Sequence, residues 1–501
     1  MNPVAFNNRY IQLGKNFSVE TCPDPVKKPE LISFNHDLAE ELGLADTCLN
    51  ASNNLADATA IFAGNLIPEG AEPVAMAYAG HQFGHFNQQL GDGRAILLGE
   101  IDAPGGTRFD IQLKGSGHTY FSRGGDGRAA LGPVLREYLL SEAMAKLNIP
   151  TTRALAAVTT GEVVARETLL PGGIITRISS SFIRVGTFQF FAARNNNEAI
   201  KTLADFVIMH HYPAIKSDDN PYIELLTLIV ERQATLIAKW MQVGFIHGVM
   251  NTDNMSIAGE TIDYGPCAFM DYYNHDQVYS SIDRNGRYAY SNQSSIGLWN
   301  LTRLAETLLP LLAENNDEAV EVAQSILKKY IETYEQNWLA GMREKLGLST
   351  QLGNDKELIE NLLNVMADNK ADFTLTFYYL SQISSDSTGM HSIDQEKALF
   401  ELFPDTEQFN QWLLKWRERL SKESLNDKAR QINMQSVNPV YIPRNHQIEA
   451  AIRAAEDSGD FSVFHELHEV LQKPYEPQTG KETYALPPEP DEVVSQTFCG
   501  T

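Results

Sequence analysis

The sequence lacks the features that mark several special classes of protein. Four cysteines in 501 residues are too few and too scattered for a disulfide framework or a zinc site. No run approaches the roughly 18 apolar residues of a membrane-spanning helix. The N-terminus has neither the basic and apolar regions of a signal peptide nor the Arg-rich composition of a transit peptide. We therefore expect a cytoplasmic protein without a membrane partner.

Positive charge is also scarce. The chain has 40 Lys and Arg against 64 Asp and Glu, which gives a formal net charge of −24. This balance argues against nucleic acid as a partner, and an anionic ligand would need a local basic cluster. The length exceeds that of an ordinary single core, so we expect two or three domains or lobes.

The pattern along the chain changes from strands to helices. After a leader broken by early prolines, short apolar runs between glycine clusters predict strands at 95–99, 109–114 and 173–178. One predicted helix, at 133–147, interrupts them, with Pro133 in its first turn. Further helices are predicted at 222–243, 297–312, 317–345, within 355–422 and at 446–472, and the Pro- and Glu-rich end reads as a mobile tail.

The most informative segment runs from His247 to Asn254 and is followed by Asp263-Tyr264-Gly265. A protein-kinase catalytic loop has the form H-R-D-x-x-x-x-N, followed by D-F-G. The His, the Asn and the second Asp fall in register, but Val249 stands at the position of the catalytic base and cannot accept a proton. Either the chain is catalytically inactive, or it performs different chemistry on a nucleotide.

A second pair of residues fits the same pattern. Lys114 ends one predicted strand and Glu137 lies on the predicted helix, as the lysine and glutamate of a kinase do. A lone lysine at a strand end is commonly a solvated edge charge, but the order of these residues with Asn254 and Asp263 favours the kinase-like interpretation. Asn254 and Asp263 offer hard oxygen ligands, which suit Mg²⁺ or Mn²⁺.

Glycine-rich turns surround these strands and are interleaved with basic residues. Backbone N–H groups in such turns approach anionic oxygens closely, because no side chain intervenes. Together they supply the basic cluster that an acidic chain requires. The turns are 80–84, 91–94, 115–117 and 124–127, and the basic residues are Arg94, Lys114, Arg123 and Arg128.

Arg177 and Arg184 lie where a protein kinase leads into its adenine slot. Guanidinium groups are poor partners for adenine but good forks for phosphate. If both point into the cleft, the triphosphate of a nucleotide points inward. The alternative is two surface arginines.

These observations predict an α+β chain with a protein-kinase-like bilobal fold. The predicted order is an N-terminal leader (1–74), a β-rich lobe (75–185), a helical lobe with the metal and catalytic loop (186–349), a helical extension (350–472) and a flexible tail (473–501).

Six blocks of the sequence, spread over nearly the whole chain, closely resemble the selenoprotein O family. They are 81–84 (HQFG), 89–94 (QLGDGR), 113–117 (LKGSG), 121–128 (FSRGGDGR), 247–254 (HGVMNTDN) and 263–267 (DYGPC). The resemblance implies a protein-kinase-like fold and protein adenylylation: ATP binds in a flipped orientation, and AMP passes to hydroxyl side chains (Ser, Thr or Tyr) of target proteins.

The resemblance also implies roles for individual residues. Asp253 would accept the proton of the target hydroxyl. The inward phosphates would be held by Lys114, Arg177 and Arg184, with Glu137 fixing Lys114; the nucleotide site would be completed by Gly91, Gly93, Arg94, Asp126 and Gly127; and the metal would be held by Asn254 and Asp263.

Two cysteines acquire a possible role from the same resemblance. Family members often carry selenocysteine or cysteine near the C-terminus, and Cys499 stands third from the end as a cysteine version. A redox-regulating disulfide between Cys499 and Cys267, beside the metal loop, is a hypothesis, because the spacing does not show that the two thiols meet.

Three functions remain in view. Adenylyltransferase is favoured; a conventional kinase-like phosphotransferase is opposed by Val249 and the two arginines; and a nucleotide-binding pseudokinase scaffold would not need Asp253. The sequence leaves open the target proteins, the choice between ATP and UTP, and the oligomeric state.

Overall fold

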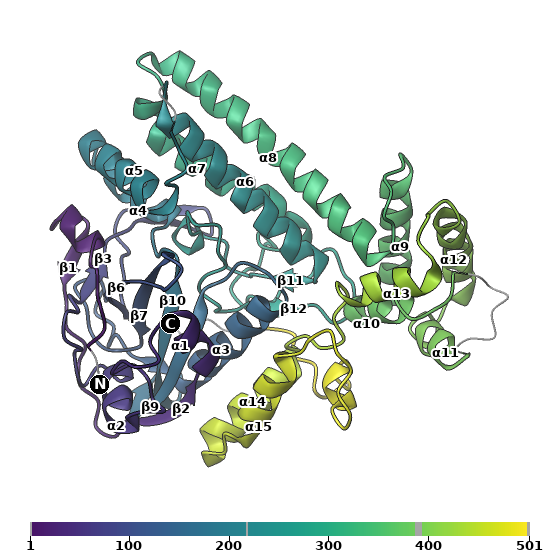
Figure 1. The fold of residues 1–501 in the computed structure, drawn as a ribbon, viewed down its shortest axis with the longest axis horizontal. Helices are drawn as coiled ribbons and strands as arrows, with labels where there is room; N and C mark the ends of the chain where they lie inside the picture. The colour runs from purple at the N-terminus through teal and green to yellow at the C-terminus, as the bar shows by residue number, and fades with distance from the viewer. Residues whose placement is uncertain (1–2, 217–218, 386–392, 498–501) are drawn as a thin grey trace.

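The computed structural model describes residues 3–216, 219–385 and 393–497, and over these residues the chain is a mixed α+β structure (Figure 1). An eight-stranded sheet has the order β1-β3-β6-β7-β10-β9-β2, with β8 paired to β10 off this path, and its strand pairs are antiparallel. Its strands are β1 (Ser18–Glu20), β2 (Glu30–Phe34), β3 (Val74–Met76), β6 (Ala95–Asp102), β7 (Arg108–Lys114), β8 (Ala129–Ala130), β9 (Arg153–Ala165) and β10 (Leu169–Ser179). The α+β class and the three predicted strands are confirmed.

The register of the central strands places two basic residues on one face of the sheet. Gln112 of β7 pairs with Arg177 of β10, and Lys114 follows Gln112 by two residues, so alternation puts all three on the same face. Ile111 and Leu113 alternate with these residues along β7 and face the opposite way. They enter an apolar layer with helices α1 (His36–Glu41) and α2 (Leu55–Phe62). The polar face of β7 and β10 is therefore directed toward the opposite layer of the molecule.

The first 74 residues differ from the expected leader, because they supply both edges of the sheet. β1 pairs with β3, and β2 pairs with β9. Helices α1 (His36–Glu41) and α2 (Leu55–Phe62) bury Leu38, Ile61 and Phe62 in the apolar layer behind the sheet. The early prolines interrupt the chain between strands without detaching it from the lobe.

Helix α3 (Leu131–Lys146) packs on β9 and β10. Two C-terminal helices, α14 (Asn445–Ser458) and α15 (Ser462–Leu471), pack in turn on α3 and form the yellow pair in Figure 1. A separate two-stranded hairpin, β4 (Gly80–Gln82) and β5 (His85–Asn87), lies between β3 and β6 in the sequence.

The chain beyond β10 is mostly helical. Its elements are α4 (Val185–Ala192), α5 (Asn197–His211), α6 (Pro221–Gln242), α7 (Gln293–Leu312) and α8 (Asn316–Lys345). The three long helices α6, α7 and α8 pack on one another, as Figure 1 shows. Gly244, with φ +72°, ends the α6 segment in a conformation that favours glycine.

A short ladder then frames the segment that carries the kinase-like residues. β11 (Phe245–Ile246) pairs antiparallel with β12 (Ala268–Phe269). Between them, the chain forms one 3₁₀ turn, Thr252–Asn254, and otherwise runs as loop. The ladder thus holds both ends of the loop at the base of the helical layer.

A second apolar core lies in the predicted helical extension, where Trp412 and Trp416 are buried. Its helices are α9 (Asp355–Asn369), α10 (Phe373–Leu380), α11 (Ile393–Glu401), α12 (Thr406–Leu420) and α13 (Asp427–Gln435). Over the described ranges, no helix combines the length and the apolar composition needed to cross a membrane.

The C-terminal segment differs from the predicted mobile tail through residue 497. The carbonyl of Pro474 accepts hydrogen bonds from the backbone of Val440 and Tyr441. Buried Arg444 donates two more to the carbonyl of Ala485, at 3.0 and 2.7 Å. The prolines and glutamates therefore belong to an extended segment that is held through its backbone, a pattern that composition does not reveal. The division into domains stays a prediction.

Candidate functional site

Five charged residues singled out in the sequence form one cluster, which we call the site cluster. Lys114 Nζ lies 2.8 Å from Glu137 Oε2 and 3.4 Å from Asp263 Oδ1. Arg177 bridges the same two carboxylates, at 2.5 Å from Glu137 and 2.7 Å from Asp263. Arg184 Nη1 lies 2.6 Å from Asp263 Oδ2. Three cations therefore share two carboxylates, an excess of one positive charge.

Each member of the site cluster comes from a different element. Lys114 ends β7, Arg177 lies on β10, Glu137 on α3, Arg184 just before α4, and Asp263 in the loop between β11 and β12. Arg177 and Arg184 are 2% and 3% exposed, so neither is a surface arginine. The Asp263 side chain keeps 18% of its surface exposed, and the cluster opens to solvent at this carboxylate.

The charges in the site cluster set one another's ionisation. Burial alone would raise the pKa of Asp263, but Arg184, Arg177 and Lys114 hold it well below its usual value. Burial would likewise raise the pKa of Glu137, and Arg177 and Lys114 hold it below the ordinary value. Both carboxylates are therefore ionised at neutral pH, and they keep the three cations in place.

Asp253 lies beside the site cluster and has a different environment. Arg184 Nη1 donates to the Asp253 carbonyl at 2.6 Å, which links the two. Among the residues that the structure describes, Gln82 Nε2 donates to Asp253 Oδ2 at 3.1 Å, while the buried Oδ1 has no hydrogen-bond partner. Burial raises the pKa of Asp253 to about 6. An oxygen of this kind is suited to accept a proton.

The two predicted metal ligands lie on the same loop. Asn254 donates its amide to the carbonyl of Val249 at 3.0 Å, and Asp263 adopts φ +59°, a left-handed conformation that aspartate tolerates better than most residues. Over the described ranges, no group of three or more His, Cys, Asp and Glu could hold a metal. A metal here would take an amide and a carboxylate oxygen from the protein and its other ligands from phosphate, a donor set that fits Mg²⁺ or Mn²⁺.

Comparison with known proteins settles the relationship that the sequence blocks indicate. The family model described as "Protein adenylyltransferase SelO" matches residues 1–472. The chain belongs to the SelO family.

Relatives cover the whole chain. A protein from Rhizobium meliloti named "Protein nucleotidyltransferase YdiU" is 55% identical over 501 residues, covering 100% of both chains. Proteins of the same name from Bradyrhizobium diazoefficiens and Rhizobium johnstonii are 56% and 55% identical over 496 residues; these matches cover 99% of this chain and 99% and 97% of theirs. The predicted resemblance is confirmed, and the chain is a member of a family of protein nucleotidyltransferases.

The glycine turns of this SelO-family chain pack tightly against a neighbouring loop. A side chain at Gly91 would place Cβ 2.2 Å from the Phe121 ring, and one at Gly93 would place it 3.0 Å from the Phe121 carbonyl oxygen. Gly127, with φ +66°, lies so close to Gly117 that Cβ would come within 1.9 Å of its carbonyl oxygen. These positions have no room for a side chain, so the backbone itself lines this part of the molecule.

The remaining predicted nucleotide residues lie around the site cluster. Arg94 is half-buried, and its charge contributes to lowering the pKa of Lys114, for which burial is the main cause. The Asp126 carboxylate is 44% exposed and pairs with Arg166 at 2.9 Å, and no recorded contact joins it to the site cluster among the described residues. The structure therefore brings Arg94 near the cluster and leaves Asp126 at the rim.

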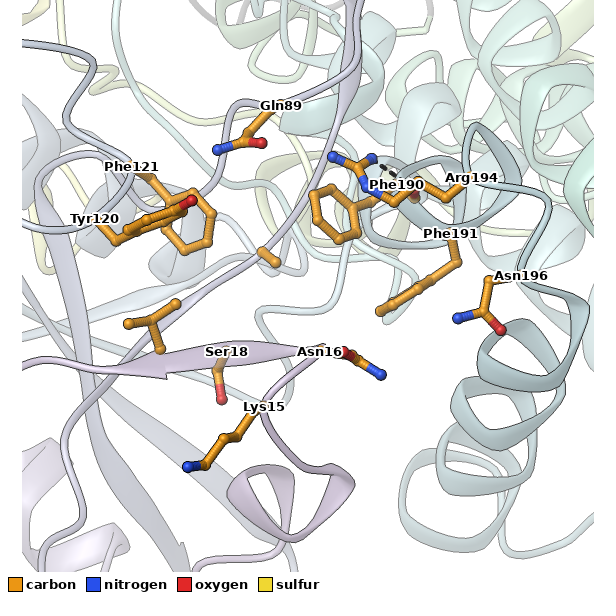
Figure 2. Close-up of a pocket in the computed structure, with 12 residues that line it drawn as sticks. Lys15, Asn16, Ser18, Gln89, Tyr120, Phe121, Phe190, Phe191, Arg194 and Asn196 are labelled. Atoms are coloured by element: carbon orange, nitrogen blue, oxygen red, sulfur yellow. Dashed lines mark hydrogen bonds between the residues drawn. The ribbon is translucent and has the colours of Figure 1, made fainter.

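A cavity of about 340 Å³ adjoins the glycine turns through Phe121. Figure 2 shows Tyr120 and Phe121 on one side, and Phe190, Phe191 and Arg194 on the other. The Arg194 guanidinium stacks 3.6 Å from the centre of the Phe190 ring. No residue of the site cluster lines this cavity. Its walls come from separate segments, so no local pattern in the sequence predicts it.

Of the two cysteines of the predicted redox pair, Cys267 and Cys499, the structure describes Cys267. Cys267 is buried, and its carbonyl accepts a hydrogen bond from Arg136 at 3.2 Å. Cys499 lies outside the described residues. Thr497, two positions before it, donates its hydroxyl to the carbonyl of Pro266 at 2.5 Å, which brings the described end of the chain beside Cys267. The disulfide stays a prediction.

Sequence reasoning missed several polar residues around Asp253. Gln82 belongs to the block 81–84, but the sequence predicts no role for its side chain. Thr252 donates to Gln189 Oε1 at 2.6 Å, and Gln189 was not singled out at all. Buried glutamines on a hairpin and a helix have no spacing rule that identifies them.

Proposed function

We propose that this SelO-family chain transfers AMP from ATP to hydroxyl side chains of target proteins, with the triphosphate directed into the site cluster. One observation carries the proposal: Arg184 contacts both a cation-rich buried cluster and the residue whose carboxylate has an unpartnered oxygen, Asp253. The cluster suits the phosphates, and Asp253 suits the incoming hydroxyl.

A protein-kinase-like arrangement is the fold that we propose for this site. The Lys114–Glu137 pair joins the sheet to α3, as the corresponding pair does in kinases. His247 is buried, and its ring contacts the carbonyl of Ile262 at 2.9 Å, which ties the start of the catalytic segment to the residue before Asp263. Val249, at the kinase base position, is buried and apolar.

The orientation of the nucleotide follows from charge. Arg177 and Arg184 are buried cations that pair with Asp263, and their place in the sequence is where a protein kinase leads into its adenine slot. A neutral base there would leave the excess positive charge unmatched, whereas phosphate oxygens accept charge-assisted hydrogen bonds from guanidinium groups. The inward position therefore belongs to the β- and γ-phosphates, and the α-phosphorus lies outward, toward Asp253.

The transfer step needs one base and one charge sink. The hydroxyl oxygen of the target forms a bond to the α-phosphorus while the bond from that phosphorus to the bridging oxygen breaks, and the hydroxyl proton passes to the Asp253 carboxylate. Lys114, Arg177 and Arg184 hold the departing pyrophosphate. A divalent metal held by Asn254 and Asp263 would supply neutralisation of the phosphate charge.

The outer part of the nucleotide site is assigned to the glycine turns. Gly91, Gly93 and Gly127 present backbone where a side chain has no room, and Arg94 and Asp126 flank them. No described residue in these turns distinguishes purine from pyrimidine, so the proposal includes UMP transfer from UTP as an outcome to be measured.

Labelled nucleotides test the proposal directly. The protein is incubated with candidate target proteins, Mg²⁺ or Mn²⁺, and ATP labelled on either the α- or the γ-phosphate. Label on protein from the α-phosphate alone supports AMP transfer. Label from the γ-phosphate alone would identify a phosphotransferase, and label from neither would identify a scaffold.

Two variants sharpen the test. Asp253→Ala should abolish labelling while circular dichroism and thermal unfolding show the fold retained, because in the described structure the carboxylate has a single hydrogen bond, from Gln82. Lys114→Ala should also fail, through lost neutralisation of phosphate. Undiminished labelling by the purified Asp253→Ala protein would overturn the assignment of the base.

Redox control is a separate proposal. The contact of Thr497 with Pro266 supports a Cys267–Cys499 disulfide. Mass spectrometry of the oxidised protein should detect the cross-linked peptides, and their absence would remove the idea.

A further inference from the structure

We infer that Gln82 is a positioning residue for Asp253: its amide binds Oδ2 and so fixes the orientation of the carboxylate that accepts the proton of the target hydroxyl. This inference rests on the proposed function. Gln82 ends strand β4 of the hairpin, and its Nε2 lies 3.1 Å from Asp253 Oδ2. Within the described ranges, its side chain hydrogen-bonds neither to the site cluster nor to a proposed metal ligand, so its action is on the orientation of Asp253.

The hairpin is hydrogen-bonded to the segment that carries Asp253 at three positions. The Phe83 backbone N–H donates to Asn251 Oδ1 at 3.1 Å, and the His81 N–H donates to Thr252 Oγ1 at 2.7 Å. Gln82 then supplies the bond to Asp253. Three consecutive residues of the hairpin thus bind the side chains of three consecutive residues of the loop, which fixes the register between the two segments.

A second layer of polar contacts holds this register in place. Thr252 Oγ1 donates to Gln189 Oε1 at 2.6 Å, and Gln189 Nε2 lies 2.9 Å from His81 Nδ1. On the other side, Tyr288 donates to Asn251 Oδ1 at 2.7 Å. Helix α4 and the segment before α7 therefore support the hairpin and the loop together, which leaves Gln82 little freedom.

Gly80 makes room for the Asp253 carboxylate. A Cβ at this position would lie 2.3 Å from Asp253 Oδ1, closer than any non-bonded contact allows. The unpartnered oxygen therefore packs against bare backbone on this side. Oδ2 is fixed by an amide and Oδ1 is confined by Gly80, so the carboxylate has one defined orientation, and the loss of either restraint would release it.

The contact predicts a specific kinetic signature. An error of about 1 Å in the placement of a reacting group can cost on the order of 100-fold in rate. Loss of the Gln82 amide should therefore lower kcat for AMP transfer, while KM and Kd for ATP stay nearly constant, because no phosphate contact changes. A merely structural role would instead lower the unfolding midpoint or weaken ATP binding.

Two substitutions and one control test it. Gln82→Met keeps the length and removes the donor, and Gln82→Glu keeps the shape and places a second carboxylate beside Asp253. Gln88→Met is the matched control, since Gln88 lies on the same segment and its side chain is exposed. AMP transfer from α-labelled ATP, ATP binding by calorimetry and thermal unfolding are measured for all four proteins.

We expect kcat to fall about 10- to 100-fold in Gln82→Met and at least as far in Gln82→Glu. In both variants, Kd for ATP and the unfolding midpoint should stay unchanged. The control Gln88→Met should transfer AMP at the wild-type rate. Wild-type kcat in either Gln82 variant would overturn the positioning role alone, as would a parallel loss of ATP binding or stability. A wild-type protein that transfers no α-label would overturn the proposed function, and the positioning role with it.

Discussion

Two buried arginine clusters in this protein have opposite balances of charge. In the site cluster, Lys114, Arg177 and Arg184 share two carboxylates, and the cluster opens to solvent at Asp263. In the second, which we call the anchor cluster, Arg444 alone serves Asp271 and Asp372, at 2.6 and 2.8 Å. The Arg444 side chain is 0% exposed.

The difference separates a binding site from a structural joint. The anchor cluster has one cation for two carboxylates, and Arg444 also donates to the Ala485 carbonyl, so the arginine has no capacity for a further anion. The site cluster, in contrast, has a cation in excess. Ionisation follows the same division: burial raises the pKa of Asp271 in spite of Arg444, whereas the pKa of Asp263 is held well below its usual value.

Removing the shared carboxylate of the site cluster should produce the largest effect. Asp263→Ala leaves three cations with Glu137 alone and removes a proposed metal ligand. We expect AMP transfer to fall on the order of 10³-fold or more, measured with α-labelled ATP. Transfer within about tenfold of wild type would show that the cluster is structural, like its counterpart.

Removing the arginine of the anchor cluster should affect stability rather than chemistry. Arg444→Met leaves the buried carboxylate of Asp372 and the partly buried carboxylate of Asp271 without this cation, and breaking a buried pair typically costs about 3–5 kcal/mol. Urea unfolding should report this loss, while transfer per folded molecule is retained. Arg284→Met, at an exposed arginine, is the control and should change stability by less than about 1 kcal/mol.

The same substitution in the site cluster should have the reverse outcome. Arg177→Met leaves Lys114 and Arg184 to balance Glu137 and Asp263, so the buried charges remain matched. We expect a smaller loss of stability than for Arg444→Met and a loss of transfer of about 100-fold, since one donor to the departing phosphates is gone. Equal losses of stability in the two variants would remove the distinction between the clusters.

The smallest expected effect is a pH dependence of the anchor cluster. Since the folded pKa of Asp271 is raised, the folded state binds its proton more tightly than the unfolded state. Stability from this group is present below the unfolded pKa of about 4, and it is lost as pH rises through the folded value. The loss is about 1.4 kcal/mol for each unit of difference between the two pKa values.

Asp271→Asn isolates this contribution, because Arg444 keeps Asp372 as its partner. The variant should unfold with a flatter dependence of stability on pH across that window than the wild type. Identical pH profiles for the two proteins, measured by urea unfolding at several pH values, would contradict the assignment to Asp271.

Much of the fold and the centre of the site could be read from the sequence because they depend on local patterns. Short apolar runs between glycine clusters located β7 and β10, and the spacing around His247 and Asp263 singled out the segment that carries the proposed catalytic residues. Lys114 and Glu137 could be paired in advance because the strand and the helix that carry them follow one another closely. These residues meet in the structure as predicted.

Long-range pairing could not be read in the same way. β1 and β2 join opposite edges of the sheet, and nothing in a three- or five-residue strand specifies a partner far along the chain. The contact of Gln82 with Asp253 spans 171 residues, and no periodic pattern marks it. The contacts of the Pro- and Glu-rich end are also long-range: Ala485 accepts from Arg444 through its backbone carbonyl, and Thr497 donates its hydroxyl to Pro266, and composition does not reveal either.

The hydrogen bond between Thr497 and Pro266 has a practical consequence. The Thr497 N–H also donates to the carbonyl of Tyr279, at 2.8 Å. Position 497 is therefore bonded to the chain on both sides of β12. An affinity tag fused to the carboxyl terminus would be attached close to these bonds. A chain truncated before Thr497 would lose both hydrogen bonds. Purification handles are better fused at the amino terminus.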